Sequence, residues 1–342
     1  MKPCNSIKRN LKKLHFYVLA LAVLAIFSGS ASGQTLKIYC IDVDQGSSTL
    51  IVTPNNKSIL IDCGDDKTAE SVYKIITDQA GLTSINYFVC THYHGDHYGA
   101  LDKLIKKGIT ITDKFYDRNS QNWLSENRTN STDYKEYKEY AGSKRKYLRP
   151  GRKISIGEGV NVECIVANGR AKNETGSIEY PSDENGYSLG LIITYNDFDF
   201  FIAGDLTDEV EPKLVEKRIL KDVDVYHVSH HGSETSSCIN FLNTIKPEVC
   251  IISNGSHGTY KHPRKKTIER LQNISSVEDI FQTNKNTKEA SYPDKIKNVP
   301  DEFIGDLDCE GDEGTILIEV KENEYLIKIL SRGIEKTYSI ER

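Results

Sequence analysis

The sequence lacks a hydrophobic run of the length that a transmembrane helix needs. An apolar stretch near the N-terminus, from Phe16 to Phe27, is too short to cross a bilayer comfortably. Five basic residues precede it and small residues occupy 28–33, an arrangement typical of a secretory signal. We therefore predict that residues 1–33 are a signal peptide cleaved before Gln34, leaving a secreted or periplasmic chain with no stable membrane span. The alternative is an uncleaved N-terminal anchor.

Cysteine pairs with zinc-finger spacing are also lacking, and no cysteine closely follows the apolar stretch, which excludes a lipoprotein box. Seven cysteines remain after residue 33, an odd number that does not suggest a disulfide framework. Four of them lie in apolar, strand-like runs, where a free cysteine behaves as a small buried hydrophobe: Cys40, Cys90, Cys164 and Cys250.

The chain has no excess of positive charge. Loss of the signal removes five basic residues and takes the formal net charge from −5 to −10. Such an acidic protein is not expected to coat nucleic acid non-specifically, although a local basic patch can still bind a phosphate. Internal repeats, low-complexity tracts and linkers are absent from the sequence, so residues 34–342 are predicted to form one domain.

The apolar pattern predicts hairpins followed by strands that alternate with helices. Strands are expected at 36–43, 49–53, 58–62, 85–90, 162–167, 187–195, 198–203, 223–228, 248–253, 314–320 and 325–330, and helices near 72–76, 100–105, 208–220 and 264–272. This order suits two sheets flanked by helices.

A polar, tyrosine-rich segment at about 113–152 interrupts the pattern and is interpreted as an insert. Tyr134, Tyr137 and Tyr140 recur every three residues, which fits one side of a helix. We expect these tyrosines to pack on the fold; the alternative is that they line a substrate site. A basic cluster at 144–146 and 149–153 is either plain surface or part of a lid over an anionic substrate.

The most informative motif is THYHGDH at 91–97, at the turn between an apolar strand and a helix. It contains four potential metal ligands within six positions: His92, His94, Asp96 and His97. Alternate strand residues point the same way, so His92 and His94 can converge on one ion, while Asp96 and His97 can face a second. Imidazole and carboxylate ligands suit zinc, manganese or iron.

HxHxDH after an apolar strand resembles the signature of the metallo-β-lactamase fold superfamily. The resemblance implies a four-layer αββα sandwich, an α/β fold of the α+β type. Further motifs occur in the order found in the metallo-hydrolase domain of the ComEC DNA-uptake family and its free-standing relatives: DVDQGSST at 42–49, ILIDCG at 59–64, ENGYSLGL at 184–191, FIAGD at 201–205, VSHHGSETSS at 228–237 and HP at 262–263.

This resemblance implies roles for residues outside the first motif. Asp205 matches the acidic ligand that bridges two ions, and Asp62 matches an acid that supports the ligand loop through hydrogen bonds. His230 is the first choice for a further ligand, with His231 orienting a phosphate or acting as an acid. His262 is the rival ligand. We assign Asp96, His231 and His262 to catalysis.

The sequence departs from the resemblance at three places. The usual DVGQGD opening reads Asp42-Val43-Asp44-Gln45-Gly46-Ser47 here. Where a third histidine for the first ion is common in the superfamily, this chain offers Asn185 and Ser188. The ComEC membrane channel is absent from the sequence given, so DNA transport is not carried over.

The motifs together favour an exported, metal-dependent hydrolase of phosphodiester bonds in a nucleotide or nucleic acid. One or two divalent ions, zinc ahead of manganese, would generate a hydroxide from bound water at neutral pH. Lys261 or Arg264 would meet the phosphate charge. The alternatives are a metallo-hydrolase of a lactone, lactam or thioester, and a non-catalytic, metal-stabilised binding module. The oligomeric state is not indicated.

Overall fold

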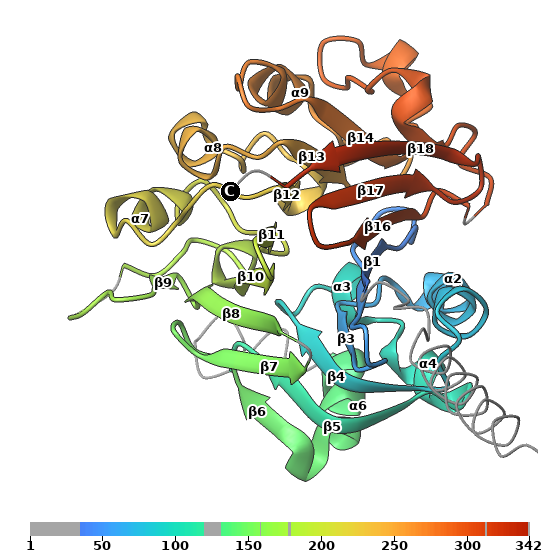
Figure 1. The fold of residues 1–342 in the computed structure, drawn as a ribbon, viewed down its shortest axis with the longest axis vertical. Coiled ribbons are helices and arrows are strands. Elements are labelled where there is room, and N and C mark those ends of the chain that lie inside the picture. Colours follow the sequence, from blue (N-terminus) through green and yellow to red (C-terminus); the bar gives the residue numbers. More distant parts are fainter. Residues whose placement is uncertain (1–34, 120–130, 158, 177–178, 312, 341–342) are drawn as a thin grey trace, which may run out of the picture. The chain divides into compact units, whose positions relative to one another are not determined.

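A computed structural model describes residues 35–119, 131–157, 159–176, 179–311 and 313–340 (Figure 1). These residues belong to one compact unit, Thr35–Arg342. The predicted signal peptide at 1–33 lies outside the described residues. Among the helices that the structure describes, none is both long and apolar enough to cross a membrane.

The first sheet has nine strands and is mixed. Strands β3 to β6 run parallel to one another, and the remaining pairs are antiparallel. Its spatial order is β18 (Ile334–Ser339), β17 (Glu324–Ile329), β16 (Ile316–Val320), β1 (Leu36–Cys40), β2 (Thr49–Val52), β3 (Ser58–Ile61), β4 (Ser84–Cys90), β5 (Thr110–Asp117) and β6 (Arg145–Tyr147).

The second sheet also has nine strands, and its parallel part runs from β11 to β15. The spatial order is β15 (Ile304–Asp306), β14 (Asp279–Asn284), β13 (Val249–Ile252), β12 (Val225–His227), β11 (Phe198–Ile202), β10 (Gly190–Tyr195), β8 (Val160–Ala167) and β7 (Lys153–Gly157), with β9 (Arg170–Ala171) paired to β8. Because the carboxyl ends of parallel strands share one edge, the loops after β11, β12 and β13 emerge together.

Helices cover the outer face of each sheet. The first sheet carries α2 (Ala69–Lys74), α3 (Gly95–Tyr98), α4 (Leu101–Lys106) and α6 (Thr132–Ala141). The second carries α7 (Glu211–Glu216), α8 (Ile239–Ile245) and α9 (Lys265–Gln272), which Figure 1 shows along one side of β11 to β14. The predicted αββα sandwich is confirmed.

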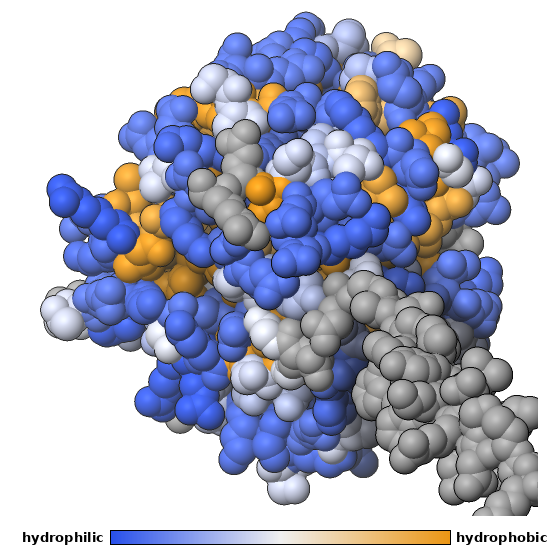
Figure 2. All heavy atoms as spheres, in the orientation of Figure 1, coloured by the Kyte–Doolittle hydropathy of each residue, from blue (hydrophilic) through white to orange (hydrophobic). Residues whose placement is uncertain are grey.

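Three apolar layers hold this sandwich together. Alternate residues of β1 show the reason: Ile38 and Cys40 face the other sheet, whereas Tyr39 faces the helices. Every second side chain of the buried strands thus enters the core between the sheets, and its neighbours enter a helix-covered core. Outside these cores, hydrophilic side chains cover most of the face in Figure 2, with small separated apolar areas.

Most predicted elements are present, with some different boundaries. The helix expected at 208–220 is only the short α7, and the helix of the metal motif is divided into α3 and α4 around Gly99. The helix expected at 264–272 is α9, and its N-cap residue is Arg264. The sequence patterns did not reveal α8 or the strands β5, β6, β7, β9, β14, β15 and β18.

The tyrosine-rich segment belongs partly to the first sheet. Asp113–Asp117 is the second half of β5, and β6 forms the sheet edge. Tyr134 and Tyr137 on α6 are buried against this sheet, as expected from the packing interpretation. Arg145 from the basic cluster pairs with buried Asp117 at 2.5 Å and does not line the pocket described below.

The seven cysteines in the described part of the chain are free thiols. Cys40, Cys90, Cys164 and Cys250 are buried in the apolar layers, as predicted from their strand-like surroundings. Burial raises the pKa of each of these thiols, so they remain protonated at neutral pH.

Candidate metal centre

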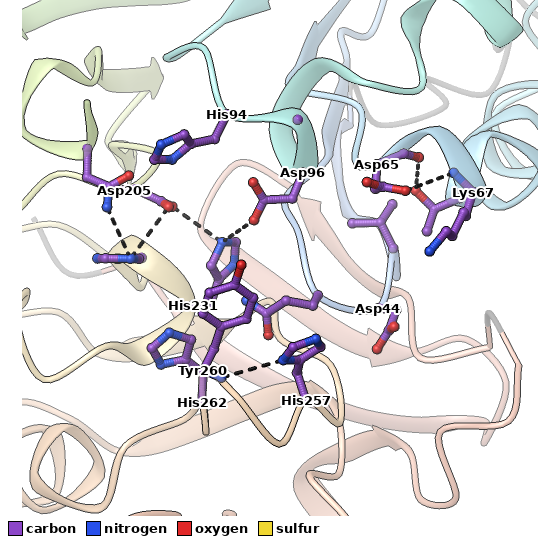
Figure 3. A pocket seen from close by; sticks show the side chains of 16 residues that line it. Asp44, Asp65, Lys67, His94, Asp96, Asp205, His231, His257, Tyr260 and His262 are labelled. Carbon is purple, nitrogen blue, oxygen red and sulfur yellow. Dashed lines mark hydrogen bonds and ion pairs between the residues drawn. The ribbon is translucent and has the colours of Figure 1, made fainter. Parts of the chain in front are cut away.

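Loops from both sheets meet at one pocket of about 610 Å³ (Figure 3). The loop after β4 supplies His92, His94, Asp96 and His97, and the loop after β11 supplies Asp205. The loops after β12 and β13 supply three more histidines: His230, His231 and His262. The pocket is lined by Val43, Asp44, Gln45, Asp65, Lys67, Thr68, His94, Gly95, Asp96, Asn185, Asp205, His230, His231, His257, Tyr260 and His262.

The first cluster of potential ligands consists of His92, His94 and Asp205, whose ligand atoms all lie within 4.8 Å of one another. His92 Nε2 is 3.1 Å from His94 Nδ1 and 3.7 Å from Asp205 Oδ2. The predicted convergence of His92 and His94 is therefore present. Two imidazoles and a carboxylate are a donor set that zinc accepts.

The second cluster consists of Asp96, His97 and His231, with ligand atoms again within 4.8 Å of one another. His231 Nε2 is 3.5 Å from Asp96 Oδ2. Asp205 Oδ1 lies 3.1 Å from His97 Nε2 and 3.4 Å from His231 Nε2. One carboxylate group thus contacts both clusters, through its two oxygens.

Hydrogen bonds on the far side of the histidine rings orient three of them. His97 Nδ1 lies 2.7 Å from Asp62 Oδ2, and His231 Nδ1 lies 3.0 Å from the Ser253 carbonyl oxygen. Since each acceptor is an oxygen, Nδ1 donates and Nε2 keeps its lone pair for the pocket.

His92 is oriented through Thr91. The Thr91 hydroxyl donates to Asp62 Oδ2 at 2.7 Å and lies 3.1 Å from His92 Nδ1, so the ring nitrogen donates to the hydroxyl oxygen. Asp62 also accepts the Thr91 backbone N–H at 2.8 Å. Asp62 is fully buried and supports the ligand loop, as its position in ILIDCG implied.

Several buried polar atoms of the two clusters have no hydrogen-bond partner. They include His97 Nε2, His231 Nε2 and Asp205 Oδ1, which face one another. Orphaned buried polar atoms are rare because they cost free energy. The donor types and their orphaned state fit one or two divalent cations.

Charges at the centre perturb several pKa values. Burial would raise the pKa of Asp205, but His97 and His231 hold it well below its usual range. Burial would also raise the pKa of Asp96, yet its neighbours His231 and His97 lower it to about 2. Both carboxylates are therefore ionised near neutral pH and available to a cation.

The paired histidines occupy an unusual backbone conformation. His230 and His231 both have φ near +54°, the left-handed region that non-glycine residues rarely adopt. The left-handed conformation costs roughly 1–2 kcal/mol per residue. The ring centroids of the two histidines lie 6.3 Å apart. Strain of this kind is characteristic of functional sites.

The structure places His231 in the second cluster, whereas His230 belongs to neither cluster. His230 Nε2 lies 3.7 Å from Asp205 Oδ2 and 3.4 Å from Asn185 Nδ2. The buried His262 ring lies 5.6 Å from that of His230 and 6.2 Å from that of His231, measured between centroids. All three histidines line the pocket.

The segment 229–238, which carries the paired histidines, is held by the buried carboxylate of Glu211. This group accepts the backbone N–H groups of Ser237 at 2.6 Å and Cys238 at 2.7 Å. Glu211 is fully buried on α7, so the helix and the segment share a hydrogen-bonded junction.

This junction predicts a pH-dependent stability. Burial outweighs the accepted hydrogen bonds and raises the pKa of Glu211 from 4.5 to about 7. Between these two pH values the folded protein keeps a proton on Glu211 that the unfolded chain has lost. The stabilisation linked to this proton is therefore fully present below pH 4.5 and disappears as pH rises to 7. We expect urea unfolding to show that, between pH 4.5 and 7, the free energy of unfolding falls more in wild type than in Glu211→Gln. The difference should be on the order of 3 kcal/mol. Equal slopes would contradict the assignment.

Five pocket residues were not identified from the sequence: Asp65, Lys67, Thr68, His257 and Tyr260. His257 and Tyr260 follow β13, so the rule that sites gather at the carboxyl ends of parallel strands would have found them. The expected phosphate partners lie elsewhere. Arg264 pairs with Glu234, and the Lys261 ammonium lies 4.7 Å from the ring centre of Tyr292.

A buried ion pair braces the ligand loop. Arg118 is almost completely buried and contacts both carboxylate oxygens of Glu184, at 2.7 and 2.6 Å. Glu184 also accepts the backbone N–H of Tyr93 at 2.9 Å, between His92 and His94. The guanidinium lies between two rings, 4.5 Å from the centre of Tyr93 and 5.0 Å from that of Tyr187. Sequence reasoning did not identify this pair.

Comparison with known proteins agrees with the motifs. The model of the metallo-beta-lactamase superfamily matches residues 41–118. The chain is 24% identical over 277 residues to recombination protein 2 of Haemophilus influenzae, covering 78% of this chain and 30% of that protein. It is 27% identical over 238 residues to competence protein ComA of Neisseria gonorrhoeae, covering 68% of this chain and 29% of that protein. The chain thus spans about three tenths of these curated relatives.

Among solved structures, a new diphosphatase from the PhnP family is 13% identical. The match covers 84% of this chain and all of that one, with a TM-score of 0.41.

Proposed function

Because the chain carries a metallo-β-lactamase domain related in sequence to ComEC-type competence proteins, we propose that it is a metal-dependent hydrolase of phosphodiester bonds in a nucleotide or nucleic acid. The fold is one that commonly binds one or two divalent metals, and the described residues offer two candidate clusters. Export of the chain remains part of the proposal, since it rests on the sequence of residues 1–33.

One observation carries the proposal: the Asp205 carboxylate contacts both clusters, with an oxygen directed at each. A bound divalent ion lowers the pKa of water and supplies a hydroxide-like nucleophile near pH 7. We assign His92, His94 and Asp205 to one ion, and the second oxygen of Asp205 would be shared with the other cluster. Asp96, His97 and His231 are assigned to a second. Zinc is favoured over manganese because four of the six side chains that form the clusters are imidazoles.

The pocket is also lined by the carboxylates of Asp44 and Asp65, but four other side chains suit an anionic substrate. His230, His262 and Asn185 line the pocket, where their nitrogens can donate hydrogen bonds to phosphoryl oxygens. Lys67 adds a cation at the same pocket. These groups therefore take over the role that the sequence assigned to Lys261 and Arg264. Neutral lactams and lactones carry no ground-state charge for such hydrogen-bond donors to bind.

Hydrolysis of bis(4-nitrophenyl) phosphate with and without added zinc or manganese tests the proposal. We expect metal-stimulated turnover by wild type and at least a tenfold lower rate for His94→Ala and Asp96→Ala, because each removes one ligand of a different cluster. Wild-type rates in both variants, or activity confined to lactam, lactone or thioester substrates in a parallel panel, would refute it. Metal binding without activity on any ester would favour the binding-module alternative.

A further inference from the structure

A tyrosine lies exposed in the pocket beside the metal clusters. Of the large hydrophobic side chains in the described ranges, six are exposed, and Tyr260 is the one among them that lines this pocket. Its exposed fraction is 54%. An exposed aromatic ring on the wall of a pocket is available for a planar ligand group to stack on. Figure 3 shows Tyr260 in the pocket with Asp96, His231, His257 and His262.

Neighbouring rings hold this tyrosine in a defined orientation. The rings of Tyr260 and His262 are parallel to within 5°, with centroids 6.2 Å apart. The ring centroid of His257 lies 4.7 Å from that of Tyr260. His257 Nδ1 also accepts hydrogen bonds from the backbone N–H groups of Thr259 and Tyr260, at 3.2 and 3.5 Å. The turn 257–260 is therefore fixed by its own histidine, and the ring is presented as a preorganised flat surface.

The position of the ring suits a substrate that reaches from the clusters toward the pocket mouth. The ring centroid of His262 lies 6.2 Å from that of His231 and 6.2 Å from that of Tyr260, so His262 lies between the second cluster and the tyrosine. A ligand whose phosphate lies beside His231 can thus place a neighbouring planar group on the tyrosine. The planar groups attached to phosphodiesters in nucleotides are bases, and every base has a face that can stack on an aromatic ring.

We propose that Tyr260 is the stacking platform of a nucleobase subsite, so that the substrate is a phosphodiester bearing an unpaired base. This inference rests on the proposed function and specifies its substrate class. Tyr260 acts through its ring face and determines specificity, whereas the metal clusters act on the phosphate.

The test compares a thymidine dinucleotide with the same phosphodiester lacking both bases. Tyr260→Leu should raise KM for the dinucleotide roughly 5- to 150-fold, the range that stacking of one base provides, and should leave the base-free substrate unchanged. Tyr260→Phe, which keeps the ring, should behave as wild type. Tyr180→Leu is a matched control, because Tyr180 is also 54% exposed but does not line this pocket.

Equal losses on both substrates, no loss on either, or a Tyr260→Phe variant as impaired as Tyr260→Leu would overturn the inference. A second measurement separates it from the proposed function. Calorimetry should show tighter binding of thymidine 5′-phosphate than of deoxyribose 5-phosphate to wild type, and this preference should disappear in Tyr260→Leu. If wild type hydrolyses neither phosphodiester, the proposed function fails, while the binding preference still decides whether the subsite exists.

Discussion

Replacing Asp205 with alanine is expected to reduce metal-dependent kcat/KM by about a thousandfold, a loss at the upper end of those seen when one electrostatic group is removed from an active site. The reason is its shared position: its oxygens lie 3.7 Å from His92 Nε2, 3.1 Å from His97 Nε2 and 3.4 Å from His231 Nε2. Any other single substitution in the clusters leaves one cluster intact, whereas this one removes a ligand from both.

Metal content and turnover should be measured together for this variant. Elemental analysis of purified Asp205→Ala should show less bound metal per chain than wild type. Asp205→Asn, which keeps the shape and loses the charge, should also be impaired. Asp208→Ala is the control, because Asp208 is exposed in the same loop and belongs to neither cluster. Unchanged metal content with unchanged turnover would exclude Asp205 as a shared ligand.

Replacing Arg118 with methionine is expected to lower the free energy of unfolding by about 3–5 kcal/mol, since it leaves the buried Glu184 carboxylate without its partner. The same change should weaken metal binding about 10–100-fold, because Glu184 holds the Tyr93 N–H between two proposed ligands. Urea unfolding and metal titration measure the two effects separately.

A double substitution tests whether the pair acts as a unit. Arg118→Met combined with Glu184→Gln removes both charges, so its destabilisation should be smaller than the sum of the two single effects. An exposed pair provides the contrast: Lys321→Ala breaks the Lys321–Glu324 contact of 2.7 Å and should leave the free energy of unfolding close to that of wild type. Strict additivity of the buried pair, or an equally small effect at Arg118, would contradict the bracing role.

The sequence predicted the sandwich because alternation along the strands and the 91–97 motif are local signals. It did not reveal β14, whose residues Asp279–Asn284 are all buried although four of the six are polar. Internal hydrogen bonds explain this burial: Gln282 Nε2 donates to Asn298 at 2.7 Å, and Thr283 donates to the Asn254 carbonyl at 3.1 Å. Hydropathy cannot distinguish a polar side chain satisfied inside the protein from one satisfied by water.

The candidate site was predictable in part for the same reason. His92, His94, Asp96 and His97 lie close together along the chain, so their spacing indicated their convergence. Which of His230 and His231 enters a cluster depends on the left-handed backbone conformation of both residues. A histidine in the sequence does not indicate that conformation. Arg118 and Glu184 are 66 positions apart and only the tertiary fold brings them together.

The division of the clusters between the sheets limits how this domain can evolve. Each cluster takes two side chains from the loop after β4, and its third from a loop of the second sheet. Neither sheet therefore supplies all three candidate ligands of a cluster. A substitution in the apolar layer between the sheets that slides one against the other would disturb both clusters at once. Residues such as Ile38 and Phe200, which pack between the sheets, thus help to set the spacing of the candidate ligands as well as the stability of the fold.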